Sequence, residues 1–236
     1  MKCAAIVLAA GRGKRMGTDT AKQYLMLNGY PVLYYSLKVF QESFTDEIIL
    51  VTSETDREYC SREFVKRYEF DKVVSIVSGG KERYHSVWAG LQAVSADCGY
   101  VFIHDAARPC LTEQILDRAY ETEKMYGSAV AAMPVKDTIK TADASGFVTG
   151  TPARDSLYLI QTPQVFRCTD IKEAYARLFS EEALLLSEGI FVTDDAMVME
   201  RFGSVPVRLF EGSYQNIKIT TKDDLAAAEI YTRWNG

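Results

Sequence analysis

The chain has 236 residues, of which 47% are hydrophobic and 25% are charged, and its formal net charge is −5 at pH 7. This composition is typical of a soluble globular protein with one sizeable core. The negative charge disfavours a nucleic-acid partner, because proteins that bind a phosphate backbone usually carry a broad basic surface. The five cysteines are scattered and form no CxxC pair, which argues against a disulfide framework and a zinc site. The sequence shows no membrane-spanning or targeting segment, so we expect a cytoplasmic protein without a membrane partner.

Apolar runs typical of buried strands alternate with amphipathic helical patterns over the first 135 residues. Strands are predicted at residues 3–10, 47–53, 73–80, 99–109 and 128–135, and helices at 31–43, 53–68, 82–94 and 112–127. Ser53 and Thr112 are the expected N-caps of the second and fourth of these helices. The alternation predicts an α/β fold, in which helices cover both faces of an open, mostly parallel sheet.

The pattern changes at Lys136. Residues 137–166 alternate polar and apolar side chains around the turn sequence DASG, which predicts a β-hairpin followed by another extended segment. Beyond it, helices are indicated around 170–189 and at 222–234, with strands at 191–196, 205–212 and 216–220, and the strand at 191–196 is expected to lead into a further helix. We expect one domain, residues 1–236, with residues 136–154 as an inserted β-arm. Such an arm is a lid, a dimer arm or a decorated loop.

Polar and glycine-bearing stretches follow each predicted strand of the sheet. Ligands of open α/β sheets bind at the edge where the strands end. The stretches at this edge are GRGKRMG, TSE, SGGKER, HDAARP and PVKDT, in chain order. They bring together glycines that allow close backbone approach, lysines and arginines that attract anions, and a carboxylate. The sequence therefore predicts an anion-binding site at this edge.

The loop after the first strand matches neither of the two common nucleotide-binding motifs. It lacks the GxxxxGK[ST] pattern of a P-loop. The dinucleotide-binding GxGxxG pattern fails as well, because Met16 stands at the third glycine position and Gly17 comes one residue late. This displaced glycine and the basic loop disfavour a nicotinamide-dependent dehydrogenase. A non-catalytic nucleotide-binding protein of the same fold remains an alternative.

The same loop nevertheless has the chemistry of a phosphate site. Gly11 and Gly13 allow backbone N–H groups to face phosphate oxygens. Arg15 offers a planar fork of donors, and Lys22 offers a mobile point charge. Four cationic side chains against one acid fall between residues 11 and 22. We therefore favour a phosphate-binding loop over a solvated surface loop.

Seven parts of the chain carry a resemblance to a known family: LAAGRGKRMG with KQYL, SGGKERYHSVWAGL, FIHDAARP, PVKDTIK, QTPQVF, VTDDA and GSYQNIKITT. The sequence resembles the 2-C-methyl-D-erythritol 4-phosphate cytidylyltransferases of the non-mevalonate isoprenoid pathway. The resemblance implies a Rossmann-like nucleotidyltransferase sheet and transfer of CMP from CTP to 2-C-methyl-D-erythritol 4-phosphate, giving 4-diphosphocytidyl-2-C-methyl-D-erythritol and pyrophosphate. Ribitol-5-phosphate cytidylyltransferases share the opening loop, the TPQ stretch and the NxKIT segment. HDAARP and VTDDA favour the methylerythritol enzyme, and the ribitol enzyme stays the alternative.

The resemblance also assigns roles to individual residues. The implied catalytic residues are Arg15, Lys22, Arg154 and Lys218. The implied nucleotide-binding residues are Ala9, Ala10, Gly11, Gly13, Gly80, Ser86, Asp105 and Ala106. The implied acceptor-binding residues are Arg108, Thr138, Arg154, Thr162, Thr193 and Lys218. A divalent cation, Mg²⁺ or another, is expected to be held mostly by phosphate oxygens, with Asp105 as a protein ligand.

Elementary chemistry supports this division of roles. The reaction brings two anions together, so alignment and charge stabilisation matter more than a covalent nucleophile. Of the two histidines, His104 is interpreted as a hydrogen-bonded structural residue rather than a proton shuttle. Asp195 is interpreted as a helix cap, and the role of Asp194 is left open. The apolar residues of the arm need a cover, and the resemblance implies a homodimer in which the arm crosses to the partner.

Overall fold

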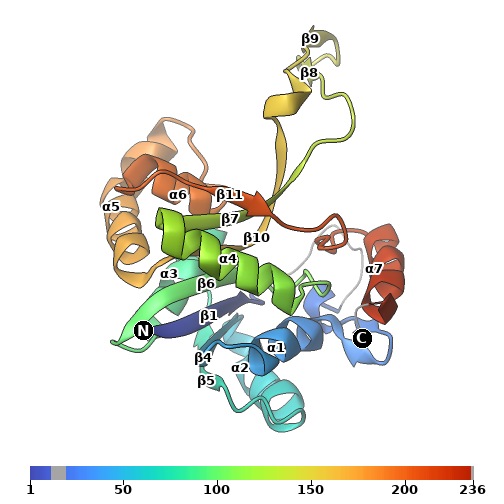
Figure 1. Ribbon diagram of the computed structural model, residues 1–236, viewed down its shortest axis with the longest axis vertical. Helices are drawn as coiled ribbons and strands as arrows, with labels where there is room; N and C mark the ends of the chain where they lie inside the picture. The colour runs from blue at the N-terminus through green and yellow to red at the C-terminus, as the bar shows by residue number, and fades with distance from the viewer. Residues whose placement is uncertain (12–19, 235–236) are drawn as a thin grey trace.

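The computed structural model describes residues 1–11 and 20–234. At its centre lies a seven-stranded sheet of order β11-β7-β10-β6-β1-β4-β5 (Figure 1). In chain order the strands are β1 (Lys2–Leu8), β4 (Glu47–Thr52), β5 (Val73–Ser78), β6 (Cys98–Asp105), β7 (Ser128–Pro134), β10 (Tyr158–Arg167) and β11 (Leu209–Glu211). Only β10 runs antiparallel to its neighbours among these described strands, whereas the other pairs are parallel. The predicted open, mostly parallel α/β sheet is confirmed.

Helices cover both faces of the sheet, because the central strands are apolar on both sides. On one face, α1 (Val32–Glu42) and α4 (Glu113–Tyr126) pack over alternate residues of β1 such as Ala5 and Val7. On the other face, α3 (Arg83–Ala93), α5 (Cys168–Ser187) and α6 (Asp195–Phe202) pack over Ala4 and Ile6. β1 is therefore buried from both sides, as its continuous apolar run predicts.

The predicted helices lie close to where the sequence placed them, but their subdivision and their capping differ from the prediction. The segment at 53–68 divides into η3 (Glu54–Asp56), α2 (Arg57–Cys60) and the π-helical η4 (Ser61–Lys66). Ser53 precedes this segment, but its hydroxyl lies 3.0 Å from that of Thr55 and makes no cap hydrogen bond. Thr112 stands at the N-cap position of α4, again without a side-chain cap hydrogen bond. The capping prediction is thus wrong in its chemistry for both residues.

Two of the strands predicted near the C-terminus are absent from the described residues. Residues 191–194 form no strand and lead into α6, which begins at Asp195, and residues 216–220 are irregular. The latter segment joins no strand ladder and is held by isolated hydrogen bonds. Ile219 N donates to the carbonyl oxygen of Ala107 at 2.8 Å, and the Asn216 amide donates to that of Thr162 at 2.9 Å. The last helix, α7 (Lys222–Trp234), is present as predicted.

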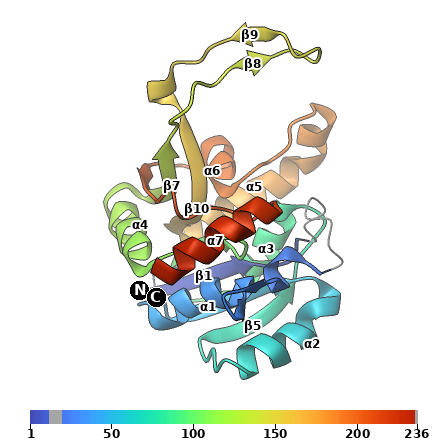
Figure 2. The same ribbon diagram turned by 90° about the vertical axis from the view of Figure 1, so that its right-hand side faces the viewer.

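The predicted hairpin stands away from the body of the molecule (Figures 1 and 2). Its strands are β8 (Thr141–Ala142) and β9 (Val148–Gly150), which pair antiparallel. Asp143 Oδ1 accepts hydrogen bonds from the backbone N–H groups of Ser145 and Phe147, which closes the DASG turn. Phe147 is 74% exposed, so the arm carries an apolar surface that its own chain leaves uncovered.

Among the described residues, three short elements lie between β1 and α1. The turn η2 (Lys22–Tyr24) precedes a small ribbon of β2 (Met26–Leu27) and β3 (Tyr30–Pro31).

None of the helices in the described part of the chain combines the length and apolar character needed to cross a membrane.

Candidate active site

A cleft of about 460 Å³ opens where β1, β5 and β6 end. Of the residues predicted from the sequence, it is lined by Ala9, Ala10, Gly11, Lys22, Gly80, Ser86, Asp105 and Lys218. Parallel strands bring their carboxyl ends to one edge, which is why residues from distant parts of the chain meet here. Gly13 and Arg15 fall outside the described residues. The predicted anion-binding edge thus coincides with a real cavity.

One end of the cleft is formed by the glycine pair after β5. A Cβ atom at Gly79 would lie 2.6 Å from Ala10 Cβ, and one at Gly80 would collide with His85. Gly80 N donates to Ser86 Oγ at 3.1 Å, which fixes the loop against the first turn of α3. Only glycine allows the backbone to approach the helix this closely. The result is a wall of backbone groups beside a buried serine hydroxyl.

The loop after β1 is held from the opposite side by η2. Gln23 Nε2 donates to the carbonyl oxygen of Ala9 at 2.6 Å. Lys22 Nζ donates to the carbonyl oxygen of Ile219 at 3.0 Å. These two hydrogen bonds join η2 to the end of β1 and to the segment that carries Lys218. Lys22 therefore lines the cleft close to a second lysine from the far end of the sequence.

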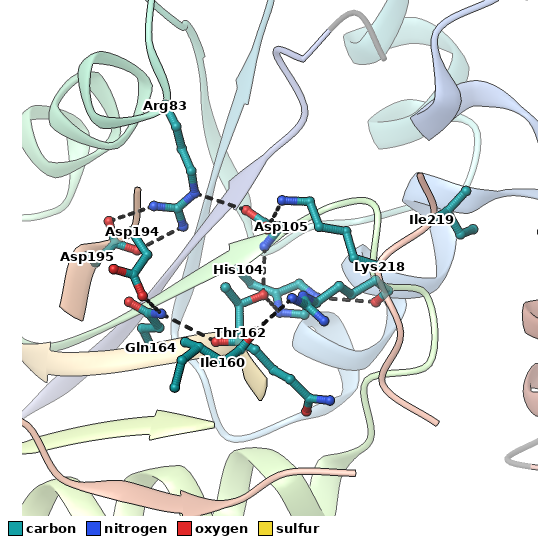
Figure 3. Close-up of polar contacts among 12 residues, drawn as sticks. Arg83, His104, Asp105, Ile160, Thr162, Gln164, Asp194, Asp195, Lys218 and Ile219 are labelled. Atoms are coloured by element: carbon teal, nitrogen blue, oxygen red, sulfur yellow. Dashed lines mark hydrogen bonds and ion pairs between the residues drawn. The ribbon is translucent and has the colours of Figure 1, made fainter. Parts of the chain in front are cut away.

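Asp105 is the carboxylate at the centre of the site (Figure 3). Its Oδ1 accepts from Arg83 Nε at 3.2 Å, and its Oδ2 accepts from Lys218 Nζ at 2.7 Å. Burial alone would raise the pKa of Asp105. The positive charges of Arg83, Lys218 and Arg108 outweigh burial and hold that pKa well below its usual range. Asp105 is therefore a carboxylate at any physiological pH.

His104 and Thr162 lie beneath Asp105 as a buried hydrogen-bonded pair. Thr162 Oγ1 accepts from the backbone N–H of Asp105 at 3.1 Å and lies 3.1 Å from His104 Nδ1. The other ring nitrogen, Nε2, lies 3.3 Å from the carbonyl oxygen of Arg108. Burial lowers the pKa of His104 to about 4, so its ring is neutral at pH 7. The interpretation of His104 as structural is confirmed.

The neighbours of this pair are also turned away from the cleft. Arg108 is only 8% exposed, and its guanidinium donates to the carbonyl oxygens of Asn216 at 2.8 Å and Ile160 at 3.4 Å. Ala106 is buried, and Ala107 takes its place in the lining. Contacts of Arg108, Ala106 and Thr162 with a substrate stay predictions.

The predicted acceptor-binding residues of the arm do not line this cleft. Arg154 is exposed, and its Nη1 donates to the carbonyl oxygen of Lys136 at 3.3 Å, within the arm itself. Thr138 is exposed on the arm as well. Thr193 is exposed ahead of α6, with its hydroxyl 3.8 Å from the sulfur of Met197. The cleft of one chain therefore gathers only part of the predicted set.

Comparison with known proteins decides the family. The family model IspD, 2-C-methyl-D-erythritol 4-phosphate cytidylyltransferase, matches residues 3–234. The chain belongs to this family. A 2-C-methyl-D-erythritol 4-phosphate cytidylyltransferase of Lachnospira eligens is 51% identical over 230 residues, covering 97% of this chain and 98% of that protein. The enzyme of the same name from Caldanaerobacter subterraneus subsp. tengcongensis is 44% identical, with 99% and 100% covered.

Solved structures of the family share the fold. The crystal structure of 4-diphosphocytidyl-2C-methyl-D-erythritol synthase from Anaerococcus prevotii superimposes with a TM-score of 0.83 at 31% identity, covering 98% of each chain. The prediction of a cytidylyltransferase that acts on 2-C-methyl-D-erythritol 4-phosphate is confirmed. The ribitol-5-phosphate alternative is not favoured.

The sequence analysis did not predict the role of two side chains of the site. Arg83 lines the cleft and joins Asp105 to Asp195, which is fully buried. The interpretation of Asp195 as a helix cap is wrong, because Asp194 is the N-cap of α6 and accepts from Met197 N at 3.0 Å. Arg83 stands within the SGGKER stretch at the end of a predicted strand. That placement was the available signal.

Proposed function

We propose that the cleft binds CTP with its cytosine against Gly80 and Ser86 and its phosphates over the loop after β1. The acceptor phosphate of 2-C-methyl-D-erythritol 4-phosphate approaches from the side of Lys218. The observation that carries this proposal is that Lys22, Lys218 and Asp105 line one cleft, with Lys218 paired to Asp105, and that the other end of this cleft is a glycine–serine wall. Two cationic side chains near each other are what two approaching phosphates require.

The chemistry in such a site needs no covalent intermediate. An oxygen of the acceptor phosphate attacks the α-phosphorus of CTP, a new P–O bond forms, and the α–β bridging oxygen leaves with its electron pair as pyrophosphate. Lys22 and Arg15 stabilise the charge that grows at the α-phosphate. Lys218, with Arg154, orients the acceptor phosphate. Positioning and charge stabilisation supply the rate, as in other phosphoryl-group transfers.

The donor set fits a divalent cation that is carried mainly by the triphosphate. Among the described residues, no three acidic, histidine or cysteine side chains come together as a metal site. Asp105 supplies a single carboxylate, and Mg²⁺ commonly binds through one or two carboxylates plus substrate phosphates. When bound, the cation neutralises phosphate charge. Asp105 is the residue that would hold it.

A two-fold dimer would complete the site. Phe147 and Val148 of the arm are 74% and 62% exposed, and an isolated two-stranded hairpin is at best marginally stable. We infer that each arm packs on a second copy of the chain and delivers Thr138 and Arg154 to the partner's cleft. A two-fold interface uses the same patch on both copies, so both sites are completed at once.

A cytoplasmic location stays a prediction.

The test is pyrophosphate release from CTP with two acceptors in parallel. We expect release with 2-C-methyl-D-erythritol 4-phosphate and none above background with ribitol 5-phosphate. Release with ribitol 5-phosphate alone would contradict the assignment of the acceptor. A chain that binds CTP but releases no pyrophosphate with either acceptor would instead favour a non-catalytic nucleotide-binding protein.

A further inference from the structure

Arg83 holds two carboxylates at once, one in the cleft and one buried behind it (Figure 3). Its Nη1 and Nη2 donate to the two oxygens of Asp195 at 3.0 and 2.8 Å. Its Nε donates to Asp105 Oδ1 at 3.2 Å. The Asp195 side chain is 0% exposed and the Asp105 side chain 11%. Arg83 therefore links a buried charge to the carboxylate at the centre of the active site.

Asp195 is itself fixed from a third direction. Tyr175 of α5 donates its hydroxyl proton to Asp195 Oδ1 at 2.6 Å. The backbone around Asp195 is anchored as well, because Gln164 Oε1 accepts from Ala196 N at 2.8 Å. A carboxylate that is buried and held in this way has little freedom to follow its partner. Arg83 must take the orientation that Asp195 imposes.

The geometry divides the donors of Arg83 unequally between the two acids. A forked arginine–carboxylate pair is stronger and more directional than a single hydrogen bond. Asp195 receives the two bonds of the fork, and Asp105 receives a single bond from Nε. The second oxygen of Asp105 thereby stays available to Lys218 Nζ, at 2.7 Å. Without the charge of Asp195, the fork of Arg83 would turn to Asp105 and compete with Lys218.

We propose that Asp195 is a positioning residue for cytidylyl transfer, which occupies the fork of Arg83 and so keeps Asp105 and Lys218 in their working arrangement. Asp195 does not line the cleft, and it acts on the substrates only through Arg83 and Asp105. The proposal rests on the activity of the family and on the placement of Asp105 in the site. Wild-type pyrophosphate release with 2-C-methyl-D-erythritol 4-phosphate is measured first, so failure of the activity itself is seen separately.

A double-mutant cycle on kcat/KM tests the route of this effect. Asp195→Asn keeps the shape of the side chain and removes its charge. We expect kcat/KM to fall by about 10- to 100-fold in the native background, within the range of couplings between contacting residues. In an Asp105→Asn background the same change should cost less than about threefold, because the group through which Asp195 acts has already lost its charge. Equal losses in both backgrounds would show that Asp195 merely supports packing and would overturn the proposal.

The neighbouring acid provides the matched control. Asp194→Asn removes the same charge one residue earlier and weakens the cap of α6, but Asp194 has no contact with Arg83 among its hydrogen bonds, which go to Met197 N and the Gln164 amide. It should lower the unfolding temperature and leave kcat/KM within about twofold of the wild type. A loss as large as that of Asp195→Asn would point to α6 as a whole, against our proposal.

A second variant keeps the test decisive where Asp195→Asn does not fold. Tyr175→Phe removes one hydrogen bond to Asp195 and leaves every charge in place. We expect Tyr175→Phe to lower kcat/KM by about two- to fivefold in the native background. The same change made in the Asp105→Asn background should leave kcat/KM unaltered. Folding is checked by circular dichroism in each case. No loss in the native background, or equal loss in both, would contradict the positioning role.

Discussion

Lys218 and Asp105 are 113 positions apart in the sequence, and Lys218 Nζ lies 2.7 Å from Asp105 Oδ2. The contact joins the end of β6 to the irregular segment before α7. The adjacent residue, Ile219, accepts a hydrogen bond from Lys22 Nζ. One short segment thus pairs Lys218 with a carboxylate and accepts a hydrogen bond from Lys22, and the site depends on that segment although it forms no strand.

Lys22→Ala should lower kcat for pyrophosphate release by about 10²–10³-fold, the size expected when one donor to a developing oxyanion is lost. The hydrogen bond to Ile219 is lost as well, so the free energy of unfolding should fall by about 1 kcal/mol. Steady-state kinetics and chemical denaturation measure the two effects. Lys66→Ala, which changes a lysine far along the chain in η4, is the control and should leave kcat unchanged. A Lys22→Ala enzyme with wild-type kcat would remove this lysine from the mechanism.

Ser86→Ala should raise the KM for CTP by about tenfold, because Ser86 Oγ accepts from Gly80 N and helps form the wall that faces the base. The wild-type enzyme should use CTP better than UTP, and both far better than ATP or GTP, since a mismatched base leaves buried polar groups unpaired. Ser187→Ala, at the exposed end of α5, serves as the control. Equal kcat/KM values for all four nucleotides would contradict this assignment of the wall.

Much of the fold follows from the sequence because its signals are local. The apolar run of β1 and the spacing of apolar residues in α1 can each be read from residues that are close together in the chain. The segments at 191–196 and 216–220 were harder, because alternation indicates an extended backbone and not the partner that receives its hydrogen bonds. In the structure, Ile219 N donates to the loop carbonyl of Ala107, so the segment joins no strand.

The residues of the site also fall into two groups, those that local sequence signals could place and those that they could not. Gly80 and Asp105 could be placed at the ligand-binding edge because they lie at the ends of recognisable strands, whereas their roles and that of Ser86 followed from the resemblance to the family. The pair of Arg83 and Asp195 could not, because 112 residues separate the partners and only folding brings them together. Local reasoning also cannot tell which of two adjacent acids caps a helix. Asp194 points to the first turn of α6, while Asp195 points inward to Arg83.

Glu123→Gln should stabilise the protein at pH 8. Glu123 in α4 is 0% exposed, neither of its side-chain oxygens has a hydrogen-bond partner in the described structure, and Arg167 Nε lies 4.0 Å away. Burial raises its pKa from 4.5 to about 7, although the charge of Arg167 opposes this. The folded state therefore holds the proton more tightly, and the stability from this group is lost as pH rises from 4.5 through 7. We expect a gain of about 1–3 kcal/mol at pH 8 and almost none at pH 4.5.

Urea denaturation at the two pH values measures this difference. Glu121→Gln, on the same helix, changes an exposed carboxylate that pairs with Lys124. It should alter the free energy of unfolding by less than about 0.5 kcal/mol at either pH. A Glu123→Gln variant that is equally destabilised at both pH values would mean that packing around this side chain, and not its ionisation, sets its effect.

Mixing two inactive variants should restore activity if the arm crosses to a partner. Arg154→Ala and Lys22→Ala chains each carry one lesion. In a mixed dimer, the cleft of the Arg154→Ala chain has its own Lys22 and receives Arg154 from its partner, so it is intact. The other cleft carries both lesions. With random exchange of equal amounts, half of the dimers are mixed, and about a quarter of all clefts are intact. Specific activity should therefore return to about a quarter of the wild-type value.

Subunit exchange must be shown independently, by co-purification of a tagged and an untagged chain. Mixing tagged and untagged Arg154→Ala chains gives the control, because every cleft then lacks the arginine. Recovery only in the complementary mixture would place Arg154 in the partner's site. The exposed positions of Arg154 and Thr138, neither of which lines the cleft of its own chain, lead us to expect that result. A mixture that exchanges and stays inactive would instead mean that Arg154 serves its own chain and that the arm with Phe147 only clasps the dimer.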